Sequence, residues 1–287
     1  MPSVDAAGTE LHYLRAGEGQ PLLLIQGMSA THLAWGRPFL EELERSFETI
    51  VFDNRGMGLS GQAELPFTTA DLAADTVALL DALELETAHL VGISMGGMIA
   101  QELALAHPER IRTLTIGASY CGGPQGTLMA PEDLQMLGEA YVSRDRERVF
   151  RAMWEINLSP DFRSDDSRFA AFTEMGAALP APQPVVLQQM RACGAHNTYE
   201  RLSQISLPTL VIHGDVDRLL GYDNGREIAA RIPGARLETL EGVGHMFWWE
   251  QPQRSAELIR EHALAGAQPD PSPAHPAGSS LPLTRKT

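Results

Sequence analysis

Short apolar runs alternate with helical patterns along most of this chain, and this alternation restricts the possible folds more than any other feature. The runs expected to form buried strands are residues 21–25, 49–53, 88–93, 112–117, 208–214 and 235–240. The helical patterns cover residues 36–47, 68–83, 96–107, 222–232 and 251–264. Strands joined by crossover helices lie parallel in one sheet, and a hairpin over residues 4–15 adds antiparallel strands. The sequence therefore predicts an α/β fold, with a mostly parallel, twisted sheet of eight strands and helices on both faces.

The alternation stops between residues 118 and 206. This stretch holds helical patterns over residues 131–143, 145–157, 165–178 and 184–194, without a convincing strand. Because it cannot extend the sheet in chain order, we expect a helical cap over one edge. The predicted organisation is a core of residues 1–120 and 205–264 and a cap of residues 121–204. Residues 265–287 include five prolines and few large apolar side chains, which predicts a disordered tail.

The charge of the chain restricts its partners. It has 22 basic and 37 acidic residues, a formal net charge of −15, and negative charge repels phosphate backbones and anionic lipids. We therefore expect no binding to nucleic acids or membranes. No apolar stretch approaches the ~18 residues of a membrane span, and no signal-peptide pattern begins the chain, which predicts a soluble cytoplasmic protein. The two cysteines, Cys121 and Cys193, make no disulfide framework and show no metal-ligand spacing.

A serine stands between glycines where a predicted strand meets a predicted helix. Residues 90–98 read L-V-G-I-S-M-G-G-M, with Ser94 between Gly92 and Gly96. A nucleophile on a tight strand-to-helix turn is lifted above the sheet, and the turn requires small neighbours so that strand and helix can approach closely. In open parallel sheets, ligands bind at the carboxyl ends of the strands, which is where this turn lies. Ser94 is therefore a candidate nucleophile.

The same glycines could instead form a phosphate-binding loop, since the chain has 26 glycines. Such a loop would carry G-K-[ST] or G-x-G-x-x-G, and this stretch carries neither. A serine hydroxyl is a poor nucleophile unless a base takes its proton, so the nucleophile hypothesis requires an acid and a histidine near later strand ends. Asp215 and Asp217 follow the run 208–214, and His245 follows the run 235–240.

Four segments together resemble the α/β-hydrolase superfamily. They are D-N-R-G-M-G-L-S at residues 53–60, G-I-S-M-G-G at 92–97, H-G-D-V-D at 213–217 and G-V-G-H at 242–245. The resemblance covers residues 10–262, and serine, acid and histidine follow in the order that the superfamily uses. Within the superfamily, the chain resembles the 3-oxoadipate enol-lactonase and polyketide methylesterase type.

The resemblance implies a role for each of these side chains. Ser94 would be the nucleophile, His245 the general base, and Asp217 the carboxylate that orients the imidazole and stabilises its protonated form. Asp217 is preferred to Asp215 because the family pattern reads H-G-x-x-D. Asp215 is expected to cap the local turn.

The resemblance also implies an oxyanion hole made of two backbone amides. One is the amide of Met95, and the other is that of Met28 in the loop I-Q-G-M-S-A, where Gln26 replaces the usual histidine of the family. The residues predicted to contact substrate are Gly27 of this loop, Trp35 and Trp248. Asp53 and Arg55 are expected to fix their own glycine-rich loop.

The implied activity is hydrolysis of a carboxylic ester or lactone of a small organic acid through an acyl-enzyme, without metal or organic cofactor. Perhydrolysis and hydrolysis of a carbon–carbon bond on the same triad are alternatives, although perhydrolase-like members usually carry a proline in the loop that here reads Q-G-M-S. A non-catalytic binding protein of the same fold is a third possibility, which the intact order of serine, acid and histidine disfavours. The expected partner is a small-molecule substrate, and the sequence predicts no oligomeric state.

Overall fold

The computed structural model describes residues 2–124, 126 and 128–266. Its strands are β1 (Ser3–Ala6), β2 (Thr9–Ala16), β3 (Gln20–Ile25), β4 (Phe47–Phe52), β5 (Ala88–Ile93), β6 (Ile111–Gly117), β7 (Thr209–Gly214) and β8 (Arg236–Leu240). Its core helices are α1 (Arg37–Glu44), α2 (Thr69–Ala82), α3 (Met95–Ala106), α9 (Asp223–Arg231), α10 (Phe247–Glu250) and α11 (Pro252–Gly266). The predicted tail, apart from its first two residues, which end α11, lies outside the described residues.

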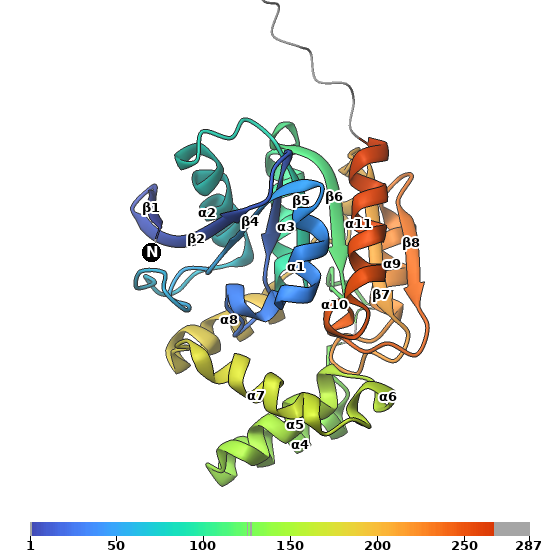
Figure 1. Cartoon of the computed structure of the whole chain (residues 1–287). Helices are drawn as coiled ribbons and strands as arrows, with labels where there is room; N and C mark the ends of the chain where they lie inside the picture. The colour runs from blue at the N-terminus through green and yellow to red at the C-terminus, as the bar shows by residue number, and fades with distance from the viewer. Residues whose placement is uncertain (1, 125, 127, 267–287) are drawn as a thin grey trace, which may run out of the picture.

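One sheet of eight strands organises the core, in the order β1-β2-β4-β3-β5-β6-β7-β8 (Figure 1). The pairs β1–β2 and β2–β4 are antiparallel, and all other neighbours are parallel. The prediction of a mostly parallel eight-stranded sheet is confirmed. Strands β5 to β8 lie side by side in chain order, so the segments that follow them emerge at one edge.

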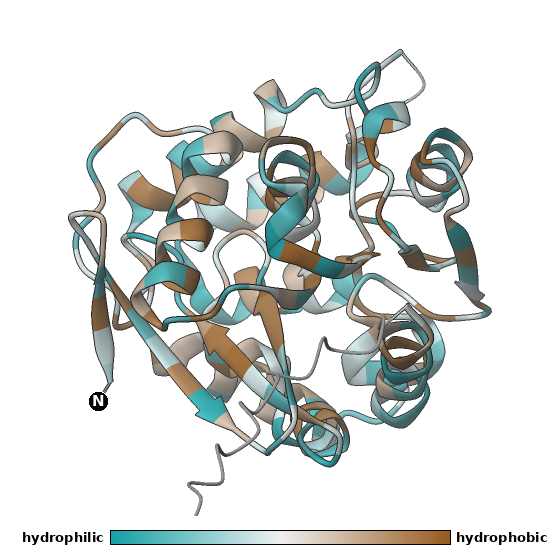
Figure 2. Cartoon of the chain, turned by 90° about the horizontal axis from the view of Figure 1, so that it is seen from above, coloured by the Kyte–Doolittle hydropathy of each residue, from teal (hydrophilic) through white to brown (hydrophobic). Residues whose placement is uncertain are grey.

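Strands β3 to β7 are buried on both faces because their apolar side chains alternate between two cores. In β3, Leu23 and Ile25 belong to the core that includes apolar side chains of α2, α3 and α9, whereas Leu22 and Leu24 belong to the core that includes those of α1 and α11. Figure 2 shows the middle strands in the brown of hydrophobic residues between the helices. Helices therefore cover both faces, as predicted. No helix within the described residues is long and apolar enough to cross a membrane.

Within the described residues, five α-helices separate β6 from β7, and we call them the cap helices. They are α4 (Pro131–Ser143), α5 (Arg146–Asn157), α6 (Pro160–Arg163), α7 (Ser167–Ala178) and α8 (Gln183–Ala195). Four match the predicted helical patterns, and the short α6 was not expected. Trp154 of α5 packs against Phe162, Phe169 and Phe172, and Phe172 also contacts Trp249 of α10, so this aromatic cluster is continuous with the core. Helices α4 to α7 lie at the bottom of Figure 1, away from most of the core.

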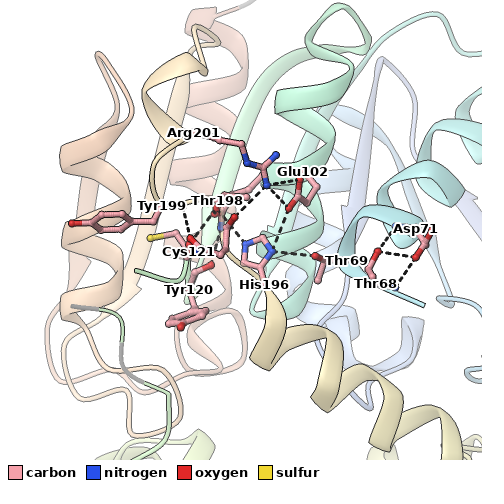
Figure 3. A network of polar contacts seen from close by, with 12 residues as sticks. Thr68, Thr69, Asp71, Glu102, Tyr120, Cys121, His196, Thr198, Tyr199 and Arg201 are labelled. Carbon is pink, nitrogen blue, oxygen red and sulfur yellow. Dashed lines mark hydrogen bonds and ion pairs between the residues drawn. The ribbon is translucent and has the colours of Figure 1, made fainter. Parts of the chain in front are cut away.

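A buried polar network joins the end of α8 to the core (Figure 3). His196 contacts the hydroxyl of Thr69 through Nδ1 at 3.1 Å and that of Thr198 through Nε2 at 3.3 Å. Thr198 in turn donates to the side-chain oxygen of Gln101 at 2.5 Å. Because Gln101 lies on α3, which begins just after Ser94, the chain leaving the cap is tied to the helix of the candidate nucleophile.

The stability of the fold is expected to fall in mild acid because two histidines are buried in their neutral form. Burial lowers the pKa of His89 and that of His196 to about 4 from 6.5. The unfolded chain therefore binds more protons than the folded one between pH 6.5 and 4. The free energy of unfolding should drop by about 3 kcal/mol per histidine as the pH falls through this window.

Urea unfolding at a series of pH values measures this loss. The variant His196→Asn should have a lower stability at pH 7 but a shallower fall between pH 6.5 and 4. An unchanged slope in the variant would contradict a neutral buried His196.

Candidate active site

Ser94 occupies the strained turn that the glycine spacing predicts. Its backbone has φ 58° and ψ −121°, between the last residue of β5 and the first of α3, and a positive φ is unfavourable for a residue with a side chain. A Cβ added to Gly92 would lie 2.2 Å from the carbonyl oxygen of Gly96, and one added to Gly96 would lie 2.0 Å from that of Ile25. Both glycines are therefore steric requirements of this turn.

The backbone around Ser94 is fixed by its neighbours. Its amide donates to the carbonyl of Gly117 at the end of β6 at 2.9 Å, and its carbonyl accepts from the amide of Gly97 and the hydroxyl of Ser119 at 2.9 and 2.8 Å. These bonds hold the strain in place. The hydroxyl of Ser94 is consequently presented at a fixed position on the edge of the sheet.

The loop after β3 lies directly against Ser94, and we call its residues 26–30 the oxyanion loop. A Cβ on Gly27 would lie 3.0 Å from the Cβ and 3.4 Å from the Oγ of Ser94. The amide of Met28 makes no hydrogen bond within the described part of the chain. The amide of Met95 lies in the first turn of α3, where amides have no acceptor inside the helix. Both amides are thus placed beside Ser94 with donor capacity to spare.

Asp217 and His245 form a buried pair. The Nδ1 of His245 lies 2.7 Å from the Oδ2 of Asp217, and the other carboxylate oxygen accepts from the amides of Leu219 and Leu220 at 2.8 and 2.9 Å. Burial alone would raise the pKa of Asp217, but the charge of His245 and hydrogen bonds from neighbouring histidines hold it well below its usual value. Asp217 is therefore an anion that fixes the orientation of the imidazole.

The choice between the two aspartates of H-G-D-V-D is visible in their partners. Asp215 is exposed and accepts from the amide of Gly242 at 2.7 Å, so it ties two loops together, whereas a cap on its own turn was expected. Asp217 is 7% exposed and contacts His245. The side chain next to the imidazole is the one that the sequence favoured.

His213 is a partner of Asp217 that sequence reasoning did not find. It is buried near the end of β7. Its Nε2 also lies 3.1 Å from the Oδ2 of Asp217 and 2.7 Å from the carbonyl oxygen of Leu220. The first residue of H-G-x-x-D therefore steadies the carboxylate at the fifth. The spacing within the motif was the only sequence signal for this contact.

The sheet brings these segments to one edge. Ser94 follows β5, Asp217 follows β7 and His245 follows β8. These strands are parallel; β7 and β8 are neighbours, and β6 lies between β5 and β7. The ring of Phe247, two residues after His245, packs on Gly117 at the end of β6, to which the amide of Ser94 is bonded. We call residues 241–246, which carry His245, the histidine loop. This loop and the turn of Ser94 thus share a neighbour.

The two tryptophans predicted to contact substrate lie in the core. Trp35 is 0% and Trp248 is 3% exposed, and their rings contact each other at 5.8 Å between centroids. Trp248 also donates from Nε1 to the carbonyl of Ala34 at 2.9 Å. The structure thus shows packing at both positions, and contact with substrate stays a prediction.

Asp53 and Arg55 fix their loop through different partners. Asp53 accepts from the amides of His32 and Leu59 at 2.7 and 2.9 Å, and Arg55 pairs with Asp75 of α2. Within the described residues, His12, His32 and Asp53 form a group whose potential metal-ligand atoms lie within 4.8 Å of one another. Each oxygen of Asp53 accepts one of these bonds, from His32 or from Leu59, so the carboxylate holds its loop in place.

The cap helices contact the loops that carry the candidate site. Gln189 of α8 accepts from the amide of Ser29 in the oxyanion loop at 2.9 Å. Arg218, next to Asp217, forms ion pairs with Asp133 of α4 and Glu155 of α5. These contacts join residues 63 to 160 positions apart, so no local pattern in the sequence could have indicated them.

The histidine loop is also bonded to the cap helices. The amide of Met246 donates to the carbonyl of Asn157 at the end of α5 at 3.0 Å. Glu250 accepts from the amides of Gly244 and Ser159, both at 2.9 Å. Both residues beside His245 are therefore held by bonds that involve the junction of α5 and α6.

The comparisons with known proteins agree with this architecture. A family model described as "alpha/beta hydrolase fold" matches residues 20–252. The "Putative carbamate hydrolase RutD" of Azorhizobium caulinodans is 31% identical, over 90% of this chain and 97% of its own. Rhodomycin D methylesterase DauP of Streptomyces sp. (strain C5) is also 31% identical, over 85% and 91%. The solved structure of Est816, an N-acyl homoserine lactone degrading enzyme, is 31% identical with a TM-score of 0.74, covering 91% and 99%. This chain belongs to the α/β-hydrolase family.

Proposed function

We propose that the protein hydrolyses a carboxylic ester or lactone of a small organic acid, using Ser94, His245 and Asp217 as a catalytic triad. The 2.7 Å contact between His245 and Asp217 carries the proposal, because a carboxylate at Nδ1 leaves Nε2 as the atom that can accept a proton. The strained turn of Ser94 supports it, since this geometry is otherwise costly.

The proposed reaction has two steps. Ser94 Oγ attacks the substrate carbonyl as His245 takes its proton, and the negative oxygen is bound by the amides of Met28 and Met95. His245 then protonates the leaving alkoxide, and an acyl-enzyme remains on Ser94. Water attacks this ester with His245 as base, and the acid is released. Asp217 stays ionised throughout and stabilises the imidazolium.

The names of the relatives support this chemistry. DauP is a methylesterase and Est816 degrades a lactone, and both substrates contain an acyl carbon bonded to oxygen. The second candidate is cleavage of a carbamate, which the 31% identity with RutD favours. A carbamate also carries an acyl carbon that Ser94 could attack.

Rapid mixing with p-nitrophenyl butyrate tests the proposal. We expect a burst of p-nitrophenol equal to the concentration of enzyme, followed by slower turnover, because the activated ester makes acylation faster than deacylation. A serine-directed phosphonate should label the peptide that contains Ser94. Absence of both turnover and labelling would refute the proposed hydrolase activity. Faster release from p-nitrophenyl N-methylcarbamate than from the butyrate ester would favour the carbamate candidate.

A further inference from the structure

Two glutamine side chains lie against the oxyanion loop with one polar end unused. The Oε1 atoms of Gln26 and Gln189 accept from the amides of Gly27 and Ser29, each at 2.9 Å. The Nε2 atoms of both have no hydrogen-bond partner among the described residues. The two side chains are buried, with exposed fractions of 2% and 0%. Each therefore offers two N–H donors that the protein itself leaves unused.

The bonded oxygen determines where each amino group lies. A carboxamide is planar, so when Oε1 is held by a loop amide, Nε2 of the same group is held beside that amide. Gly27 and Ser29 are the residues on either side of Met28, and Gly27 lies against the side chain of Ser94. The unused donors are thus held against the segment whose Met28 amide binds the carbonyl oxygen in the proposed mechanism.

Buried donors without acceptors cost folding free energy, and folded proteins contain few of them. Here two such donors lie against one short loop: Gln26 belongs to the loop itself, and Gln189 belongs to the cap helix α8. Gln188, the neighbour of Gln189 on α8, shows the ordinary arrangement, because its Nε2 donates to the carbonyl of Phe67 at 2.6 Å. A ligand that brings an oxygen atom would supply the missing acceptor at Gln26 and Gln189.

We infer that Gln26 and Gln189 determine substrate specificity, by donating hydrogen bonds to a second oxygen acceptor on the acyl part of the substrate. The donors are uncharged, which suits a neutral carbonyl oxygen, whereas a carboxylate would be buried without an opposite charge from this pair. The inference rests on the proposed function, which places the acyl group at Ser94. It names the substrate class as esters or lactones whose acyl chain carries a further carbonyl.

A matched pair of substrates tests this inference. p-Nitrophenyl 4-oxopentanoate and p-nitrophenyl pentanoate have acyl chains of equal length and differ only in the ketone. We expect the native protein to have a kcat/KM at least about 10-fold higher for the ketone, which corresponds to one buried hydrogen bond. Gln189→Glu keeps an oxygen for the amide of Ser29 but removes the donors, so this ratio should fall to about 1 or below. Gln26→Glu should act in the same direction.

Gln188→Met is the control, because it lies on the same helix and does not contact the oxyanion loop. Its ratio should equal that of the native protein. No preference for the ketone in the native protein would overturn the inference. An unchanged ratio in Gln189→Glu would also overturn it and leave Gln189 as a tie between cap and loop.

Calorimetric binding to Ser94→Ala separates this inference from the proposed function. We expect the 4-oxopentanoate ester to bind at least about 10-fold more tightly than the pentanoate ester. The double variant Ser94→Ala, Gln189→Glu should lose this difference. If the native protein hydrolyses neither ester but the binding preference is found, the proposed function fails, while the part of the inference that assigns the donors of Gln26 and Gln189 to a second carbonyl of the ligand is kept. If neither ester binds, or both bind equally, the inference fails.

Discussion

Ser94→Ala is expected to lower kcat for p-nitrophenyl butyrate by about 10⁴- to 10⁶-fold, because it removes the atom that forms the acyl-enzyme. The methyl group of alanine fits where the serine Cβ already lies, and the bonds that hold the turn use the backbone of residue 94. The fold should therefore persist while the chemistry is lost. Steady-state kinetics with circular dichroism on the same preparation measures both.

Ser119→Ala is the matched control. Ser119 is a buried serine near the turn whose hydroxyl donates to the carbonyl of Ser94 at 2.8 Å. Its loss should reduce activity far less than the loss of Ser94, and the phosphonate label should remain. Full activity in Ser94→Ala would show that another residue is the nucleophile.

Asp217→Asn is expected to lower kcat by about 10⁴-fold, the second largest effect. The amide oxygen of asparagine can still accept from Leu219 and Leu220, so the loop should keep its shape. Its NH2 group, however, would face Nδ1 of His245, and the imidazole would then favour the tautomer that carries its proton on Nε2. Such a histidine cannot accept the proton of Ser94. Kinetics of the purified variant from pH 6 to 9 would measure the loss.

Asp215→Asn makes the same chemical change two residues away. Because Asp215 is exposed and bonded to the amide of Gly242, the effect on kcat should be within a few-fold. A larger loss from Asp215→Asn than from Asp217→Asn would reverse the assignment of the acid.

The strands and most helices could be predicted because their signals are local. Buried strands of a parallel sheet are continuous apolar runs, and each expected strand lies within two residues of the observed one. Helices α6 and α10 have only four residues each, too few for a helical period to appear. They form where the cap and the histidine loop are packed, which is a property of the folded chain.

The residues of the candidate triad could also be predicted from the sequence. Ser94, Asp217 and His245 each follow a recognisable strand, and parallel strands deliver the residues that follow them to one edge. The roles of Gly92 and Gly96 follow from the same turn. Only the structure showed how close these glycines are to the backbone, and that His213 shares Asp217 with His245.

The sequence by itself determined the fold class, the order of the strands along the chain and the identity of the residues proposed to react, because these depend on local periodicity and short motifs. The tertiary structure decided what surrounds them. Gln189 reaches Ser29 across 160 positions and Arg218 reaches Asp133 across 85. Such contacts form only when α4, α5 and α8 pack against the loops that follow β3 and β7, and no local preference of the chain specifies which side chain will meet which loop.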